Sequence, residues 1–231
     1  AIGQFEQRII VANEVTTDPP KNQLQPLINL YRQGQLQQAL DNAKQLLSQF
    51  PNSMMLYNIK GAVNKRLGQF DAAIDSYKQA IQLNPNYADA YNNLANALIK
   101  KGDIDASIDT YKKALKIRPD YAEAHYNMGV ALKDKGDLEA AINSYKQVLK
   151  INPHHAETYN SMGSALNDKG DLDAAIISFK KALKIKPDYA EAYNNMGIVL
   201  ADNGELDAAI DSYNKAIKIK PDYHRAYYHL G

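Results

Sequence analysis

Proline and glycine recur in this sequence at a fixed interval of 34 residues. The prolines are Pro51, Pro85, Pro119, Pro153, Pro187 and Pro221, and the glycines are Gly34, Gly68, Gly102, Gly136, Gly170 and Gly204. Because two residue types keep the same step in independent registers, the chain is a series of copies of one unit.

Placing each proline at position 32 of a 34-residue unit gives five full units, 54–87, 88–121, 122–155, 156–189 and 190–223. We interpret residues 21–53 as a degenerate unit that caps the array, and expect Pro26 to shorten its first helix to a start near Pro26. Residues 1–20 show no repeat and are interpreted as a non-repeat segment or linker. Residues 224–231 restart the pattern and stop within a helix, so we expect the chain to be part of a longer protein.

Each unit has the pattern of two helices. Apolar or small residues at positions 4, 7, 8 and 11 form one face of an amphipathic first helix. The glycine at position 15 can end that helix in a left-handed conformation, and the proline at position 32 ends the second helix. We expect the second helices to be capped by Asp103, Asp137 and Asp171, and the first helices by Asp120, Asp188 and Asp222.

Small and aromatic residues complete the pattern. Position 8 is Gly or Ala, positions 20 and 27 are small in almost every unit, and position 24 is Tyr77, Tyr111, Tyr145, Phe179 or Tyr213. This arrangement resembles the tetratricopeptide repeat, although position 4 is Tyr or His rather than Trp. The resemblance implies an all-α fold, a right-handed α-solenoid of helix-turn-helix repeats. It also implies a protein-protein interaction scaffold rather than an enzyme.

The first helices of such a solenoid line its concave surface. Positions 2, 6, 9 and 13 lie on one side of that helix and form what we call the polar stripe. The candidate ligand-binding residues of this stripe are Asp89, Asn93, Asn96, Glu123, Asn127, Asp134, Glu157, Ser161, Asp168, Glu191, Asn195 and Asp202. Their acidic character predicts a groove that favours an extended peptide of neutral to basic charge.

Asparagine at position 6 offers a donor and an acceptor to a peptide backbone. The row resembles the asparagine ladder in the tetratricopeptide superhelix of O-linked N-acetylglucosamine transferases, which holds extended peptide. On that resemblance Asn93, Asn127 and Asn195 match the ladder, and Ser161 interrupts it.

Other interpretations of the stripe stand beside this one. The asparagines can be exposed polar residues without a ligand, and the acids at position 2 can be helix caps. Asp134, Asp168 and Asp202 differ, because the helix dipole disfavours an anion in the last turn. Helix stability therefore does not explain them.

Composition excludes several classes of function. The 27 basic and 26 acidic side chains balance, which argues against a nucleic-acid or membrane partner. The absence of cysteine removes disulfides and thiolate sites, and fits a reducing, cytoplasmic compartment. No catalytic motif, cofactor-binding loop or metal site is recognised, and the pair His154-His155 has no third ligand nearby in the sequence.

Two alternatives to the scaffold remain open. The array can be the substrate-docking arm of a larger transferase, of glycosyl- or sulfotransferase type, whose catalytic domain lies beyond residue 231. Alternatively, near-identical units can stack head to tail on another copy of the chain, as a self-assembling superhelical protomer.

Overall fold

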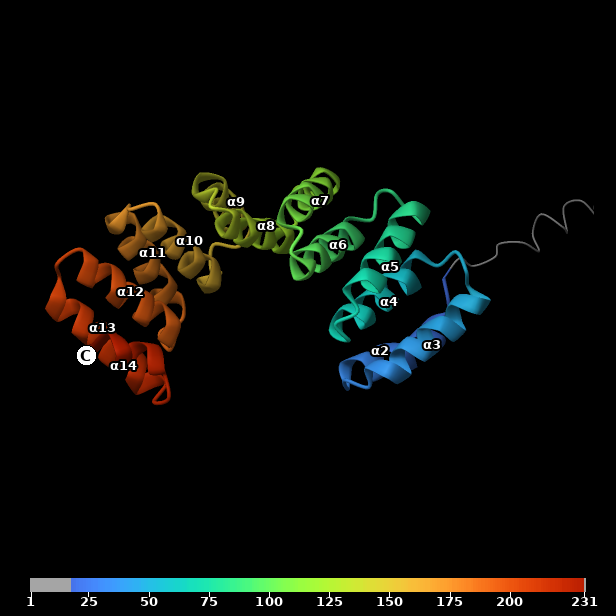
Figure 1. The fold of residues 1–231 in the computed structure, drawn as a ribbon, viewed down its shortest axis with the longest axis horizontal. Coiled ribbons are helices and arrows are strands. Elements are labelled where there is room, and N and C mark those ends of the chain that lie inside the picture. The colour runs from blue at the N-terminus through green and yellow to red at the C-terminus, as the bar shows by residue number, and fades with distance from the viewer. Residues whose placement is uncertain (1–17, 231) are drawn as a thin grey trace, which may run out of the picture. The chain divides into compact units, whose positions relative to one another are not determined.

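The structure is a computed structural model that describes residues 18–230. Helices are the regular elements of this part of the chain, which contains no strand. They fall into two compact units, Ala1–Asp103 and Ile104–Gly231. The first unit contains α2 (Lys21–Arg32), α3 (Leu36–Gln49), α4 (Met54–Arg66), α5 (Phe70–Leu83) and α6 (Ala88–Lys101) (Figure 1). The second contains α7 (Ile104–Ile117), α8 (Ala122–Lys135), α9 (Leu138–Ile151), α10 (Ala156–Asp168), α11 (Leu172–Ile185), α12 (Ala190–Asp202), α13 (Leu206–Ile219) and α14 (His224–Leu230).

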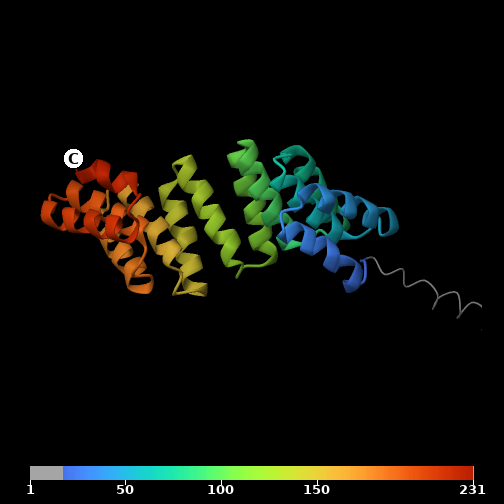
Figure 2. The same cartoon turned by 90° about the horizontal axis from the view of Figure 1, so that it is seen from below.

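Consecutive helices pack against one another in both units. In the first unit α4 and α5 form a hairpin, and α5 also contacts α6. In the second unit the hairpins are α8 with α9, α10 with α11, and α12 with α13, each next to its neighbour along the chain (Figure 1, Figure 2). The all-α solenoid of helix-turn-helix repeats predicted from the 34-residue period is confirmed.

Close approach within a hairpin explains why position 8 must be small. A Cβ atom added at Gly129 would lie 2.6 Å from Cε1 of Tyr145, the aromatic residue at position 24 of the same repeat. Tyr145 is fully buried. The tyrosine ring therefore packs directly on the backbone of the first helix, which fixes the spacing of the two helices.

The glycine at position 15 ends the first helix as expected. Gly102 is the C-cap of α6 with φ of 93°, and Gly136 is the C-cap of α8 with φ of 88°. These values lie in the left-handed region, which glycine adopts without steric cost.

The predicted caps of the second helices are confirmed for α9 and α11. The Oδ1 atom of Asp137 accepts a hydrogen bond from the backbone N–H of Ala140 at 3.2 Å. Asp171 accepts one from Ala174 at 3.3 Å. Each bond satisfies an amide that the helix itself leaves without a partner.

The predicted caps of the first helices are wrong at Asp120 and Asp188. The N-caps of α8 and α12 are Tyr121 and Tyr189, and neither makes a side-chain cap bond. The hydroxyl of Tyr189 accepts a hydrogen bond from Asn160 of the preceding first helix at 3.3 Å. The N-cap residue of α12 is therefore held by a tertiary contact with α10.

The prediction that the first helix of the degenerate unit starts near Pro26 is also wrong. The helix α2 begins at Lys21 and contains Pro26. Leu24 and Leu27 are both buried, with exposed fractions of 7% and 0%. Burial of a leucine contributes about 1.5–3 kcal/mol. A proline inside a helix costs about 3 kcal/mol, because a hydrogen bond is lost and the ring clashes with the carbonyl of residue i−4. Burial of Leu24 is of comparable size and offsets much of this cost.

Candidate functional site

The candidate residues all lie on first helices of the repeats. In the first unit Asp89, Asn93 and Asn96 lie on α6. In the second unit Glu123, Asn127 and Asp134 lie on α8, Glu157, Ser161 and Asp168 on α10, and Glu191, Asn195 and Asp202 on α12. The acids at position 2 fall in the first turn of their helix, where the dipole favours an anion.

Hydrogen bonds connect position 6 of one repeat to position 5 of the repeat before it. The Nδ2 atom of Asn93 donates to Oδ1 of Asn58 at 3.0 Å in the first unit. In the second unit Nδ2 of Asn195 donates to Oδ1 of Asn160 at 3.1 Å. These bonds hold neighbouring first helices in register, and they orient the amide at position 6.

The interruption of the asparagine row at Ser161 is matched by a change at position 5. Tyr126 stands there in place of asparagine, and its hydroxyl lies 3.1 Å from Oγ of Ser161. The serine therefore makes the same connection between repeats with a shorter side chain.

Asn160 is a central residue of the site that the sequence interpretation missed. Its Nδ2 atom donates to the hydroxyl of Tyr189 at 3.3 Å and to Oε1 of Glu191 at 3.2 Å, while its Oδ1 atom accepts from Asn195. It is buried, with an exposed fraction of 4%. The helical wheel assigned position 5 to neither stripe nor core. The available signal was the asparagine at position 5 in four of the five full repeats, Asn58, Asn92, Asn160 and Asn194.

The acids at position 13 are exposed at the other end of the first helices. Asp134, Asp168 and Asp202 all face solvent. Oδ2 of Asp168 lies 3.2 Å from Nζ of Lys133 on the preceding first helix. A surface ion pair of this kind contributes little free energy. Lys133 therefore offsets only part of the negative charge of the stripe.

The acids at position 2 affect the pKa of the tyrosine at position 34. Burial raises the pKa of Tyr189 above its ordinary value, and the charges of Glu191 and Glu157 raise it further. The Tyr189 hydroxyl therefore remains protonated at neutral pH, and its oxygen accepts the hydrogen bond from Asn160.

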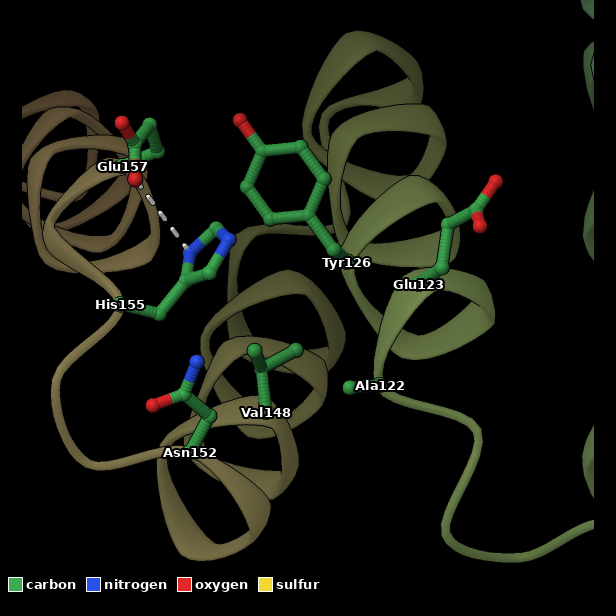
Figure 3. Close-up of a pocket in the computed structure, with 7 residues that line it drawn as sticks. All are labelled: Ala122, Glu123, Tyr126, Val148, Asn152, His155 and Glu157. Carbon is green, nitrogen blue, oxygen red and sulfur yellow. Dashed lines mark ion pairs between the residues drawn. The ribbon is translucent and has the colours of Figure 1, made fainter.

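A pocket of about 270 Å³ opens between α8, α9 and α10 (Figure 3). It is lined by Ala122, Glu123, Tyr126, Val148, Asn152, His155 and Glu157. In Figure 3, His155 and Glu157 lie on one side of the Tyr126 ring and Glu123 on the other. The structure thus places two candidate acids, from neighbouring repeats, around one aromatic pocket.

A smaller hollow of about 110 Å³ lies on the polar stripe between α10 and α12. Asn195, Ser164 and Ile198 contribute to its lining. Asn195 is therefore both oriented by a neighbouring repeat and accessible from a depression of the surface.

His155 has a structural role in the turn before α10. Its Nδ1 atom accepts a hydrogen bond from the backbone N–H of Thr158 at 3.2 Å, which makes it the N-cap of that helix. Within residues 18–230, no group of His, Cys, Asp and Glu side chains is arranged to hold a metal ion. In the same part of the chain, every helix is too short or too polar to cross a membrane.

Sequence comparison identifies the repeats. A family model described as TPR repeat matches residues 61–102, 95–136 and 163–204. A model described as Tetratricopeptide repeat matches residues 122–155 and 190–223. Another model with the same description matches residues 28–53. Comparison with curated proteins gives no significant match.

Solved structures with the same fold include YrrB, described as a TPR protein with an unusual peptide-binding site. It is 22% identical, with a TM-score of 0.68 over 81% of this chain and 97% of YrrB. A MamA structure is 27% identical, with a TM-score of 0.67 over 71% of this chain and 96% of MamA. MamA from Desulfovibrio magneticus RS-1 is 20% identical, with a TM-score of 0.69 over 74% of this chain and 96% of that structure. The repeat spacing, the helical hairpins and the family matches agree, and this chain belongs to the tetratricopeptide repeat family.

Proposed function

We propose that this chain is a non-catalytic protein-interaction scaffold that binds an extended peptide segment along the polar stripe of α8, α10 and α12. The observation that carries the proposal is the orientation of the position-6 side chains by bonds between repeats, as in the pair Asn195 and Asn160. An amide has two N–H donors and a carbonyl acceptor, so an amide that donates once to its neighbour can also bond a peptide backbone. Because the side chain is already held in place, less conformational entropy is lost on binding.

Charge favours a neutral to basic segment. The stripe of the second unit carries acids at position 2 and exposed acids at position 13 of α8, α10 and α12. Lys133 pairs with Asp168, and Lys186 pairs with Glu157, which moderates this charge on α10. Acidic surfaces of this kind select the partner by complementary charge.

The same stripe on α6 in the first unit provides Asp89, Asn93 and Asn96, with Asn93 oriented by Asn58. A peptide is supported as the class of ligand by YrrB, a protein of the same fold described as having a peptide-binding site. We infer that each unit offers a stretch of the same recognition surface.

Fluorescence anisotropy with extended peptides sorted by net charge, at two salt concentrations, tests the proposal. We expect basic peptides to bind most tightly. Salt should lower their affinity, because the charges of the stripe are exposed. The triple variant D134N/D168N/D202N should weaken the binding of basic peptides by roughly 3- to 150-fold, since exposed pairs contribute about 0.2–1 kcal/mol each. The triple variant D173N/D207N/D211N makes the same charge change on the second helices, and should bind as the parent does.

The asparagines are tested separately from the charges. Alanine at Asn127 and Asn195 should weaken peptides of every charge class, because the bonds to the peptide backbone are lost. Thermal unfolding followed by circular dichroism checks that the repeats remain packed, since Asn195 also bonds Asn160. Unchanged affinity in both the asparagine and the aspartate variants would contradict a groove on the polar stripe.

A further inference from the structure

Three turns of the second unit place a cation from position 31 over the tyrosine ring at position 34. The distances to the ring centroid are 4.4 Å for Arg118 and Tyr121, 4.7 Å for Lys186 and Tyr189, and 5.4 Å for Lys220 and Tyr223. A cation over an aromatic face is attracted by the ring quadrupole. In each of these turns a basic side chain of the protein therefore lies over the ring. We call the place of this side chain, beside the ring at position 34, the slot.

The slot also contains a carboxylate. Nζ of Lys186 lies 3.7 Å from Oε1 of Glu157, the acid at position 2 of the same repeat. Lys186 is thus held between a carboxylate and the ring of Tyr189. This arrangement describes the chemistry that the slot selects, a basic side chain between an anion and an aromatic face.

Repeat 122–155 lacks the basic side chain but keeps the slot. Position 31 is Asn152, whose Oδ1 atom accepts a hydrogen bond from the backbone N–H of His154 at 3.1 Å and so lies in the turn. Position 2 is still an acid, Glu123, and position 34 is still a ring, His155. The pocket of about 270 Å³ in Figure 3 opens at this place.

Aromatic character is increased in this repeat by Tyr126, which replaces the asparagine found at position 5 of the other full repeats. Its ring centroid lies 5.7 Å from that of His155 and 6.0 Å from that of Tyr145. The ring is therefore fixed at the wall of the pocket by neighbours on both sides, and presents a rigid surface to a ligand.

The lining contains no lysine or arginine. The Nδ1 atom of His155 accepts a hydrogen bond from the backbone N–H of Thr158, and lies 2.8 Å from the Oγ1 atom of Thr158 and 3.8 Å from Oε2 of Glu157. The charged lining side chains are Glu123 and Glu157. Glu157 is shared with Lys186, which approaches from the next repeat.

We propose that this pocket takes a lysine or arginine side chain of the bound segment, in the place that Lys186 occupies one repeat further along. The inference rests on the proposed peptide-binding function, and gives that function a point of side-chain selection. Repeat 122–155 then selects a particular side chain of the bound peptide, while the amides of the stripe form hydrogen bonds with the peptide backbone.

The probe for the pocket is Nα-acetyl-lysine methylamide, titrated into the ¹⁵N-labelled protein and followed by amide chemical shifts. We expect saturable shifts at Tyr126, His155 and Glu157. Nα-acetyl-norleucine methylamide has the same four-carbon side chain without the ammonium group, and should bind about tenfold more weakly or not at all. Equal binding of the two compounds would overturn the proposal, since an apolar hollow alone would explain it.

The variant N152K restores to this repeat the residue type that the chain uses at Lys186 and Lys220, so the fold accepts it. The new lysine should fill the slot and weaken the binding of the lysine probe about tenfold or more. H154K adds the same charge at an exposed neighbouring position outside the pocket, and should bind the probe as the parent does. E157Q, which changes no side-chain volume, should weaken the probe severalfold.

The two proposals fail in different ways. Loss of lysine binding in both N152K and H154K would mean that only net charge matters, which would contradict a specific pocket. Peptides without lysine or arginine should bind N152K and the parent equally by anisotropy, because they do not use the pocket. Saturable lysine binding without any peptide binding would count against the groove alone, and peptide binding that N152K leaves unchanged for lysine peptides would count against the pocket alone.

Discussion

Tyr126 and Tyr145 lie with their ring centroids 6.0 Å apart, but their hydroxyl groups have opposite environments. The hydroxyl of Tyr126 bonds Ser161, whereas that of Tyr145 is buried without a hydrogen-bond partner among residues 18–230. A buried hydroxyl without a partner costs about 1–3 kcal/mol. We therefore expect Y145F to raise the free energy of unfolding by about 1 kcal/mol, measured by urea denaturation. Phe179 occupies the same position in repeat 156–189, so the pocket for the ring accepts phenylalanine.

Y126F is the matched control, because it removes a hydroxyl that does have a partner. It should lower the free energy of unfolding by about 0.5–1.5 kcal/mol. The pH dependence gives a second measurement, since burial raises the pKa of Tyr145 above the ordinary value of about 10. The unfolded chain then releases this proton first, so stability is fully present below pH ~10 and falls as pH rises above it. Y145F should reduce that alkaline loss, and a lower stability for Y145F at neutral pH would show that the hydroxyl has a favourable environment.

At the scale of residues, the polar side of the first helices could be predicted, but the hydrogen bonds between the residues on that side could not. The 34-residue period and the helical wheel place Asn195 on the stripe. They do not show that Asn195 bonds Asn160, because that partner belongs to the preceding repeat and becomes a neighbour only when hairpins stack. The pocket at Asn152 has the same origin, since three helices from two repeats form it.

At the scale of elements, the period predicted the hairpins because glycine and proline act on local backbone geometry. Helix starts were predicted correctly where the capping bond is local, as at Asp137 and Asp171. They were wrong where tertiary packing competes, as at Asp188 and Pro26. Local capping bonds therefore fix the starts of α9 and α11, whereas tertiary contacts accompany the starts of α12 and α2.

The helix α13 offers a test of the capping argument. Its N-cap is Glu205, which makes no side-chain cap bond, although α11 is capped by Asp171 at the same position of the repeat. We expect E205D to stabilise the chain by about 0.5–1 kcal/mol, and D171E to destabilise it by about the same amount, since a good N-cap contributes ~1 kcal/mol. Neither substitution changes the net charge. Equal shifts of the two unfolding curves in one direction would show that the bond to the third amide is not the cause.

At the scale of the whole molecule, the contacts of each unit are made between helices that follow one another closely in the chain. Leu27 of α2 belongs to a core cluster formed with α3 and α4 in the first unit. Leu200 of α12 is buried in the second unit. In repeat proteins of this kind, stability is a sum of repeat terms and nearest-neighbour terms, so damage in one repeat is felt mainly by its neighbours.

Native-state hydrogen exchange measured by mass spectrometry tests this locality with a matched pair of variants. L27A should cost about 2–5 kcal/mol locally, and should speed amide exchange in α2, α3 and α4 while leaving α10 to α13 close to the parent rate. L200A should do the reverse, with faster exchange in α12 and α13 and little change in α2 to α4. Faster exchange in every helix of both variants would mean that the chain unfolds as one cooperative body. The local pattern would instead show that a weakened repeat can open while the repeats that carry the lysine pocket and the stripe remain folded.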